Sequence, residues 1–146
     1  MQDIQQIVVP VDFQKHTEEL AEFAIGVAKP LGAEVTFFHV VENVVFYADF
    51  VPTNFAQQEE QTYEYANKKM RALVEKSKSK LAQCTGQVSR GDVVDTILEY
   101  AEDEGMDLIV MATHGARGIE KILLGSVAER VIKRSKCPVL VFKSHK

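Results

Sequence analysis

Runs of strand-like composition alternate with stretches of helical periodicity along the chain, and this alternation constrains the fold more than any other feature. The runs are short and rich in β-branched and aromatic residues, as buried strands are. We expect five strands, at Ile4–Asp12, Glu34–Val41, Gln87–Ser89, Asp107–Met111 and Val139–Phe142. Strands that alternate with helices are typical of an α/β protein with a mainly parallel sheet.

Helices are expected in the intervals, because apolar residues recur there at spacings of three and four. They run over Thr17–Leu31, Gln57–Gln83, Val93–Glu104 and a segment that begins at Gly125-Ser126. Right-handed crossovers then place helices on both faces of the sheet. The predicted fold is therefore a doubly wound, three-layer α/β/α domain.

Individual residues mark where these helices begin and end. Thr17 and Asp92 occupy expected N-cap positions, while Gly32 and Gly105 follow the last periodic residues. The apolar segment from Glu42 to about Phe55 has no clear period, and we expect a long connection folded against the body.

Composition sets the class of protein. The chain has 146 residues, 46% hydrophobic and 26% charged, which fits a single globular domain over 1–146. It has no apolar run long enough to span a membrane, and its first residues, Met1–Asp3, do not resemble a signal peptide. We expect a cytoplasmic protein without a membrane partner. Two cysteines are too few for a disulfide framework.

Charge is distributed unevenly around a net value of −4. From Ala112 to the end, eight Lys and Arg residues stand against two acids, a local balance of +6, and the remainder carries −10. This pattern argues against a broad nucleic-acid surface and is compatible with a local anion site. Four of the cations fall near the end of the last helix, where the helix dipole alone favours them.

The segment Met111–Ser126 joins a predicted strand to a predicted helix and contains Gly115, Gly118 and Gly125. Glycines let the backbone approach a ligand closely, and the first amides of a helix attract phosphate. A plain loop followed by a capping Ser126 explains the same spacing equally well.

In a doubly wound sheet, ligands bind at the carboxyl ends of the strands where the winding reverses. If the first and fourth strands are neighbours, Pro10-Val11-Asp12 and Met111-Ala112 face each other across one crevice. Such a crevice would suit a nucleotide: apolar side chains for the base, an acid for the ribose, and the first amides of a helix for the phosphates. Asp12 could instead only cap the turn that follows its strand.

The chain resembles the universal stress protein family over essentially its whole length. The resemblance is carried by Ile7–Phe13, Phe38-His39-Val40, Gly91-Asp92, Asp107–Met111 and Lys136–Val141. The family's ATP-binding pattern, G-2x-G-9x-G-(S/T), is matched by Gly115, nine further residues and Gly125-Ser126. Ala112 replaces the first glycine of the pattern. The resemblance implies strand order 3-2-1-4-5 and a homodimer through the last strand, Val139–Phe142.

The resemblance also implies a set of nucleotide-binding positions. Pro10, Val11 and Asp12 would lie at the base and ribose, and Val40 would hold adenine through its backbone. The ribose and phosphates would be flanked by Met111, Ala112 and Gly115, and the phosphates bound by Gly125, Ser126 and Val127, with His114 and Arg117 nearby. A Mg²⁺ ion would be held mainly by the phosphates.

The expected function is that of an ATP-binding sensor or regulator, with ATP or another adenine nucleotide as ligand. Two alternatives remain open: a slow ATP hydrolase or adenylate-handling enzyme, and an interaction protein that has lost nucleotide binding, which Ala112 would favour. No His and acid pattern activates Ser126 as a nucleophile, and no P-loop lysine occurs. The four histidines show no metal-ligand spacing, and His39 is expected to be a hydrogen-bonded core residue.

Overall fold

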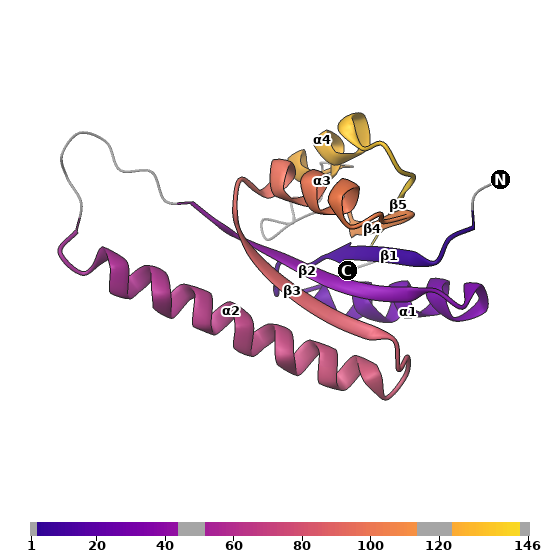
Figure 1. Cartoon of the computed structure of the whole chain (residues 1–146), viewed down its shortest axis with the longest axis horizontal. Helices are drawn as coiled ribbons and strands as arrows, with labels where there is room; N and C mark the ends of the chain where they lie inside the picture. The colour runs from indigo at the N-terminus through magenta and orange to yellow at the C-terminus, as the bar shows by residue number, and fades with distance from the viewer. Residues whose placement is uncertain (1–2, 44–51, 114–123, 144–146) are drawn as a thin grey trace.

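The computed structural model describes residues 3–43, 52–113 and 124–143. Within them, five parallel strands form one sheet in the order β3-β2-β1-β4-β5, which confirms the predicted fold and strand order (Figure 1). The strands are β1 (Gln6–Pro10), β2 (Glu34–Glu42), β3 (Cys84–Gly91), β4 (Leu108–Ala112) and β5 (Val139–Phe142). The helices are α1 (Thr17–Leu31), α2 (Phe55–Lys78), α3 (Val93–Asp103) and α4 (Ser126–Arg134).

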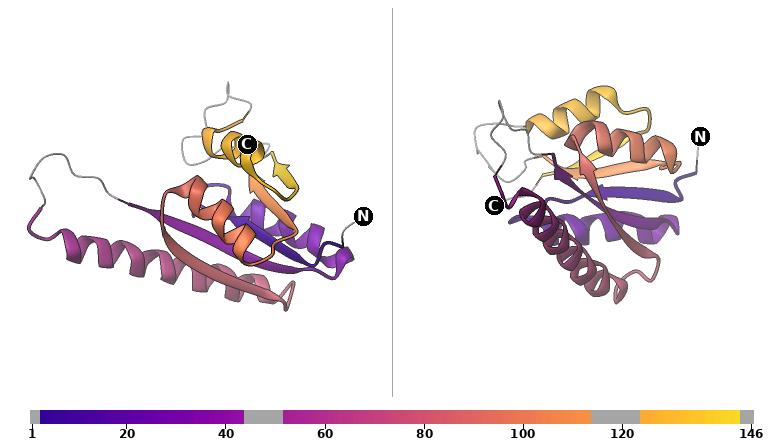
Figure 2. Two further views of the ribbon diagram at one scale, coloured as in Figure 1. Left: turned by 45° about the horizontal axis from the view of Figure 1, so that its top comes forward. Right: turned by 60° about the vertical axis from the view of Figure 1, so that its left-hand side comes forward.

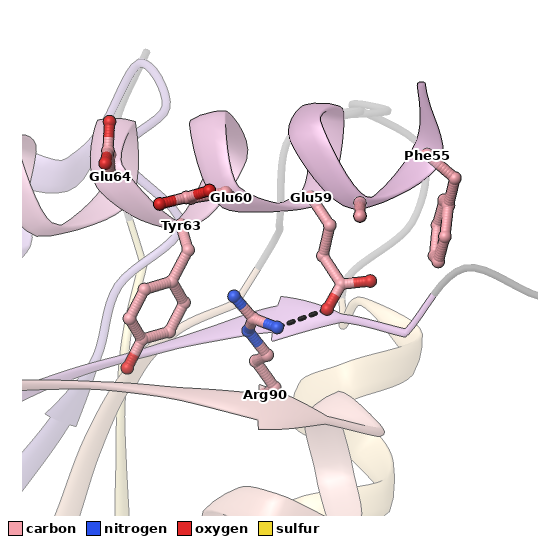
Figure 3. A pocket seen from close by; sticks show the side chains of 7 residues that line it. Phe55, Glu59, Glu60, Tyr63, Glu64 and Arg90 are labelled. Atoms are coloured by element: carbon pink, nitrogen blue, oxygen red, sulfur yellow. Dashed lines mark hydrogen bonds and ion pairs between the residues drawn. The ribbon is translucent and has the colours of Figure 1, made fainter. Parts of the chain in front are cut away.

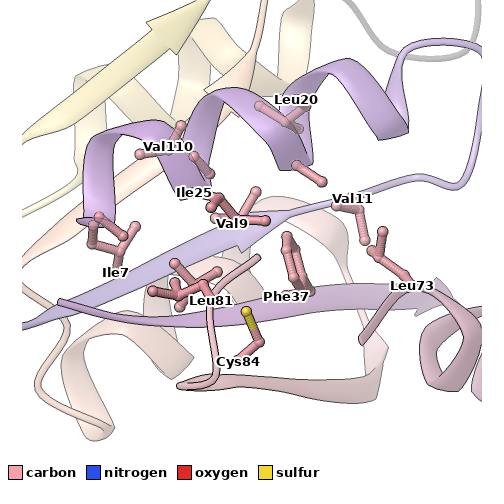
Figure 4. Packing of buried hydrophobic residues seen from close by; sticks show 14 of the residues in the cluster. Ile7, Val9, Val11, Leu20, Ile25, Phe37, Leu73, Leu81, Cys84 and Val110 are labelled. Carbon is pink, nitrogen blue, oxygen red and sulfur yellow. The ribbon is translucent and has the colours of Figure 1, made fainter. Parts of the chain in front are cut away.

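Two helices cover each face of the sheet (Figure 2). Because successive side chains of a strand point to opposite faces, neighbouring residues join different cores. Val9 and Phe37 pack with α1 and α2, as Figure 4 shows, whereas Val8 and Phe38 pack with α3 and α4. Strands buried on both faces explain the continuous apolar runs of the sequence.

The helix signals hold at three of the four predicted positions. Gly32 adopts the left-handed conformation (φ 63°) after α1, and Gly105 does so (φ 65°) after α3. The Asp92 carboxylate accepts the Asp95 amide at 3.0 Å and caps α3. Thr17 is not a cap: His16 is the N-cap, and the buried Thr17 hydroxyl has no hydrogen-bond partner among the described residues.

The predicted bounds were wrong by two or more residues for three elements: β1 is shorter at both ends than the expected Ile4–Asp12, and α2 and β3 differ most. α2 ends at Lys78 rather than Gln83, because the chain turns there, with the Ser79 hydroxyl donating to the Lys76 carbonyl at 2.8 Å. Leu81 continues the helical period by chance and is buried from the turn. β3 has eight residues rather than the three expected, since its pairing with residues 35–42 of β2 outweighs its weak strand composition.

The first turns of α2 project beyond the body of the sheet (Figure 1). The buried residues of this helix begin only at Ala66 and continue through Met70, Leu73 and Ser77. Most of the predicted connection before α2, residues 44–51, lies outside the described residues.

Candidate functional site

The structure brings nine of the predicted site residues to one end of the sheet. Pro10, Val11 and Asp12 end or follow β1, Val40 lies near the end of β2, and Met111 and Ala112 end β4, while Gly125, Ser126 and Val127 begin α4. The amide of Gly125 donates to the carbonyl of Thr113, which ties the start of α4 to the end of β4. The other three predicted residues, His114, Gly115 and Arg117, lie outside the described part of the chain.

The hydrogen-bonded pairing of β1 with β4 stops before either strand ends. β1 pairs with β2 as far as Pro10↔Phe38, but its pairing with β4 stops at Val8↔Ile109. Beyond that point β4 pairs with β5 alone, to the end of the strand. β1 and β4 are also the two strands at which the winding of the sheet reverses, where ligands bind in folds of this kind.

Pro10 explains why the pairing stops. Main-chain groups along a parallel strand point alternately to its two neighbours. The Val11 amide donates to the Phe38 carbonyl of β2 at 2.8 Å, so position 10 faces β4. The next bond of that ladder would need an N–H at position 10, and proline has none.

The start of α4 supplies donors to the same end of the sheet. The first amides of a helix have no acceptor within it and carry its positive dipole end. The Gly125 amide is already used by Thr113, which differs from the expectation that it binds phosphate. The amides of Ser126 and Val127 therefore remain as the donors best suited to an anion, together with the exposed Ser126 hydroxyl.

Asp12 caps the turn that follows β1, which was the predicted alternative to ligand binding. One carboxylate oxygen accepts the Gln14 amide at 2.9 Å. Phe13 follows with φ 60°, a left-handed conformation that is unusual for an aromatic residue. Because a carboxylate has two oxygens and about four lone pairs, capping the turn leaves Asp12 capacity for a further donor.

A separate hollow lies between the first turns of α2 and the end of β3 (Figure 3). Its lining comprises Phe55, Ala56, Glu59, Glu60, Tyr63, Glu64 and Arg90. Arg90 pairs with Glu59 and lies over the Tyr63 ring, 4.5 Å from its centroid. With three glutamates against one arginine that is already paired, this hollow is unsuited to a phosphate.

Part of the positive charge in the described C-terminal region is paired with acids. Arg134 pairs with Asp95 at 2.7 Å and Lys136 with Glu102 at 2.9 Å, both across the α3–α4 side. Exposed pairs of this kind contribute little to stability. Both cations lie at or beyond the end of α4 and face α3, so they do not lie at the start of the helix.

The described residues contain no group of three or more His, Cys, Asp or Glu side chains that could hold a metal ion. None of the helices in the described ranges is long and apolar enough to cross a membrane.

Comparison with known proteins identifies the family. The model of the universal stress protein family matches residues 3–143. The chain belongs to the universal stress protein family. It is 36% identical over 141 residues to universal stress protein MJ0531 of Methanocaldococcus jannaschii, a match that covers 97% of this chain and 83% of that protein.

Solved universal stress proteins share the fold. The structure of hypothetical protein MJ0577, from the same archaeon, superposes with a TM-score of 0.86 at 28% identity, over 99% of both chains. An Archaeoglobus fulgidus universal stress protein, solved in complex with dAMP, has a TM-score of 0.61 at 21% identity, over 96% of this chain and 98% of the other.

Proposed function

We propose that this chain is a cytoplasmic ATP-binding universal stress protein that acts as a nucleotide-dependent sensor or regulator. The observation that carries the proposal is the early end of the β1–β4 pairing at Pro10, at the same end of the sheet as the link from Gly125 to Thr113 after β4. The dAMP complex of a family member with the same fold supports an adenine nucleotide as the ligand.

In this proposal each part of the nucleotide meets a different element. Adenine lies against the backbone of Val40, and the ribose lies between Asp12 and the end of β4. The phosphates, with any Mg²⁺ ion that they hold, face Ser126 and Val127. Nucleotide occupancy would alter a surface read by a partner protein, in a homodimer formed through Val139–Phe142.

The test is binding measured by thermal shift and calorimetry with ATP, ADP, AMP and GTP. A ligand at one hundred times its Kd stabilises the folded state by about 2.7 kcal/mol, so binding is visible as a raised Tm. We expect a shift with adenine nucleotides. The absence of a shift with every nucleotide would reject the proposal and favour a role in protein interaction alone.

Two variants test whether the phosphates bind at the start of α4. Ser126→Asp sets a negative charge among the amides, where the helix dipole itself favours an acid, so the fold should be retained. Gly125→Val adds bulk at φ −69° and ψ 160°, a conformation that valine adopts readily. Both variants should abolish ATP binding.

Ala82→Asp is the matched control for Ser126→Asp. Ala82 is exposed and precedes β3, at the opposite end of the sheet, so the same added charge should leave binding unchanged. Retained micromolar binding in both α4 variants would refute this placement of the phosphates.

A further inference from the structure

The main chain of Val40 borders a break in the pairing of β1 with β2. The two strands pair as far as Pro10↔Phe38, and the last ladder bond runs from the Val11 amide to the Phe38 carbonyl at 2.8 Å. Groups two residues apart on a strand point to the same side, so the N–H and C=O of Val40 also face β1. In a continuing ladder the Val40 amide would donate to the Val11 carbonyl.

A side chain donates to that carbonyl, in the place where the Val40 amide would bond. Nδ1 of His39 lies 2.7 Å from the Val11 oxygen, and because a carbonyl only accepts, Nδ1 carries the proton and donates. Among the described residues, Val40 has no main-chain partner on the β1 side. The imidazole thus confirms the prediction of a hydrogen-bonded His39 and replaces one rung of the sheet.

Phe13 lies at a bend two residues after Val11. Its backbone is left-handed (φ 60°), and its ring packs on His39 with centroids 4.7 Å apart. A non-glycine residue in this conformation is held at some cost in energy, which is more common at functional sites than elsewhere. Phe13 and His39 together therefore fix how β1 leaves the sheet.

We propose that His39 is a positioning residue that leaves the main-chain N–H and C=O of Val40 unbonded, so that they form a hydrogen-bonding edge for the base. A neighbouring donor and acceptor on one residue are complementary to a purine edge that offers an acceptor beside an amino group, as adenine does. The role at the base rests on the proposed nucleotide site. The absence of a hydrogen bond at the Val40 amide does not depend on a nucleotide and can be measured in the protein by itself.

The test compares His39→Asn with His39→Leu. The asparagine amide nitrogen stands close to the position of Nδ1 and can still donate to Val11, whereas leucine leaves that carbonyl for the Val40 amide. By NMR hydrogen exchange without nucleotide, the Val40 amide should exchange fast in the wild type and His39→Asn and become protected in His39→Leu.

Binding supplies the second measurement. His39→Leu should bind ATP about tenfold more weakly, the value of one hydrogen bond of about 1.4 kcal/mol, and His39→Asn should remain within about threefold of the wild type. Inorganic triphosphate, which has no base, should shift the Tm of all three proteins equally. A uniform loss for ATP and triphosphate would show a merely structural role and overturn the inference.

The two proposals fail in different ways. A protected Val40 amide in the wild type without nucleotide overturns the inference about His39, whatever ATP does. A free Val40 amide in a protein that binds no nucleotide upholds the positioning by His39 and rejects the proposed function. If His39→Leu does not fold, the wild-type exchange rate and the binding of His39→Asn still decide the matter.

Discussion

Restoring an N–H at position 10 should extend the hydrogen-bonded pairing of β1 with β4. In Pro10→Val the new amide would face β4 and could donate to the Val110 carbonyl, the next acceptor in the register that now stops at Val8↔Ile109. Valine suits a buried strand, so the substitution adds a donor without disfavouring the strand. We expect the two strands to pair one step further toward their carboxyl ends.

The expected effect on binding follows from one hydrogen bond. In the proposed site a nucleotide binds between the ends of β1 and β4 and must break the new bond. A net contribution of about 1 kcal/mol from that bond then weakens binding about fivefold. Loss of proline increases the entropy of the unfolded chain and destabilises the folded state by up to about 1 kcal/mol. The two effects offset each other in the free energy of unfolding, so ATP affinity should fall while overall stability changes little.

Calorimetry with ATP and hydrogen exchange at position 10 measure these effects separately. Pro138→Val is the matched control, because Pro138 precedes β5 at the opposite, amino end of the strands. ATP affinity equal to that of the control, together with a fast-exchanging amide at position 10, would refute the idea that the missing donor of Pro10 ends the pairing.

Other substitutions test the packing, the thiols and the free edge of the sheet. Gly86→Val should lower the free energy of unfolding in urea by about 1–3 kcal/mol, because a Cβ there would lie 2.5 Å from Met70 Cγ and 2.8 Å from Val74 Cγ2; a change within about 0.5 kcal/mol would contradict this contact. Gly26→Ala, in α1 with nothing within 4 Å of the added carbon, should instead stabilise by about 0.5–1 kcal/mol. Burial raises the pKa of the Cys84 thiol, so its contribution to stability is complete below the ordinary thiol pKa and is lost as pH rises through the raised value. Cys84→Ala should flatten the alkaline side of the stability profile, and a thiol reagent should label the half-buried Cys137 well before Cys84; equal labelling rates would argue against the burial of Cys84. Val141→Glu, on the apolar edge strand β5, should convert the proposed homodimer to a monomer in light scattering without unfolding it, and an unchanged mass would show that the dimer does not use this edge.

Much of the fold could be predicted from local patterns. The boundaries of α1, the cap of α3 by Asp92 and the whole of β5 follow from short-range signals that the structure retains. The misplaced boundaries lie where long-range contacts outweigh those signals. Pairing with β2 extends β3 over residues of weak strand composition, and the buried Leu81 continues a helical period after the helix has ended.

The candidate site was less predictable, because it depends on main-chain hydrogen bonds between strands that are absent at Pro10 and Val40. The sequence indicated that Pro10 and Asp12 end a strand, but not that the missing N–H of Pro10 faces β4. It indicated a hydrogen-bonded His39, but not that the partner is the Val11 carbonyl. No local pattern signals a bond between two strands that are far apart in the sequence.

The amino-acid sequence alone determined the order of strands and helices and the two-sided burial of the sheet, because these follow from the spacing of apolar residues along one chain. The register of β1 against β2 and β4 was decided only by the tertiary structure. Register fixes which neighbour each main-chain group faces, so the same proline and histidine would have different consequences one residue away. The early end of the β1–β4 pairing and the unpaired main chain of Val40 on the β1 side therefore arise from the assembled sheet.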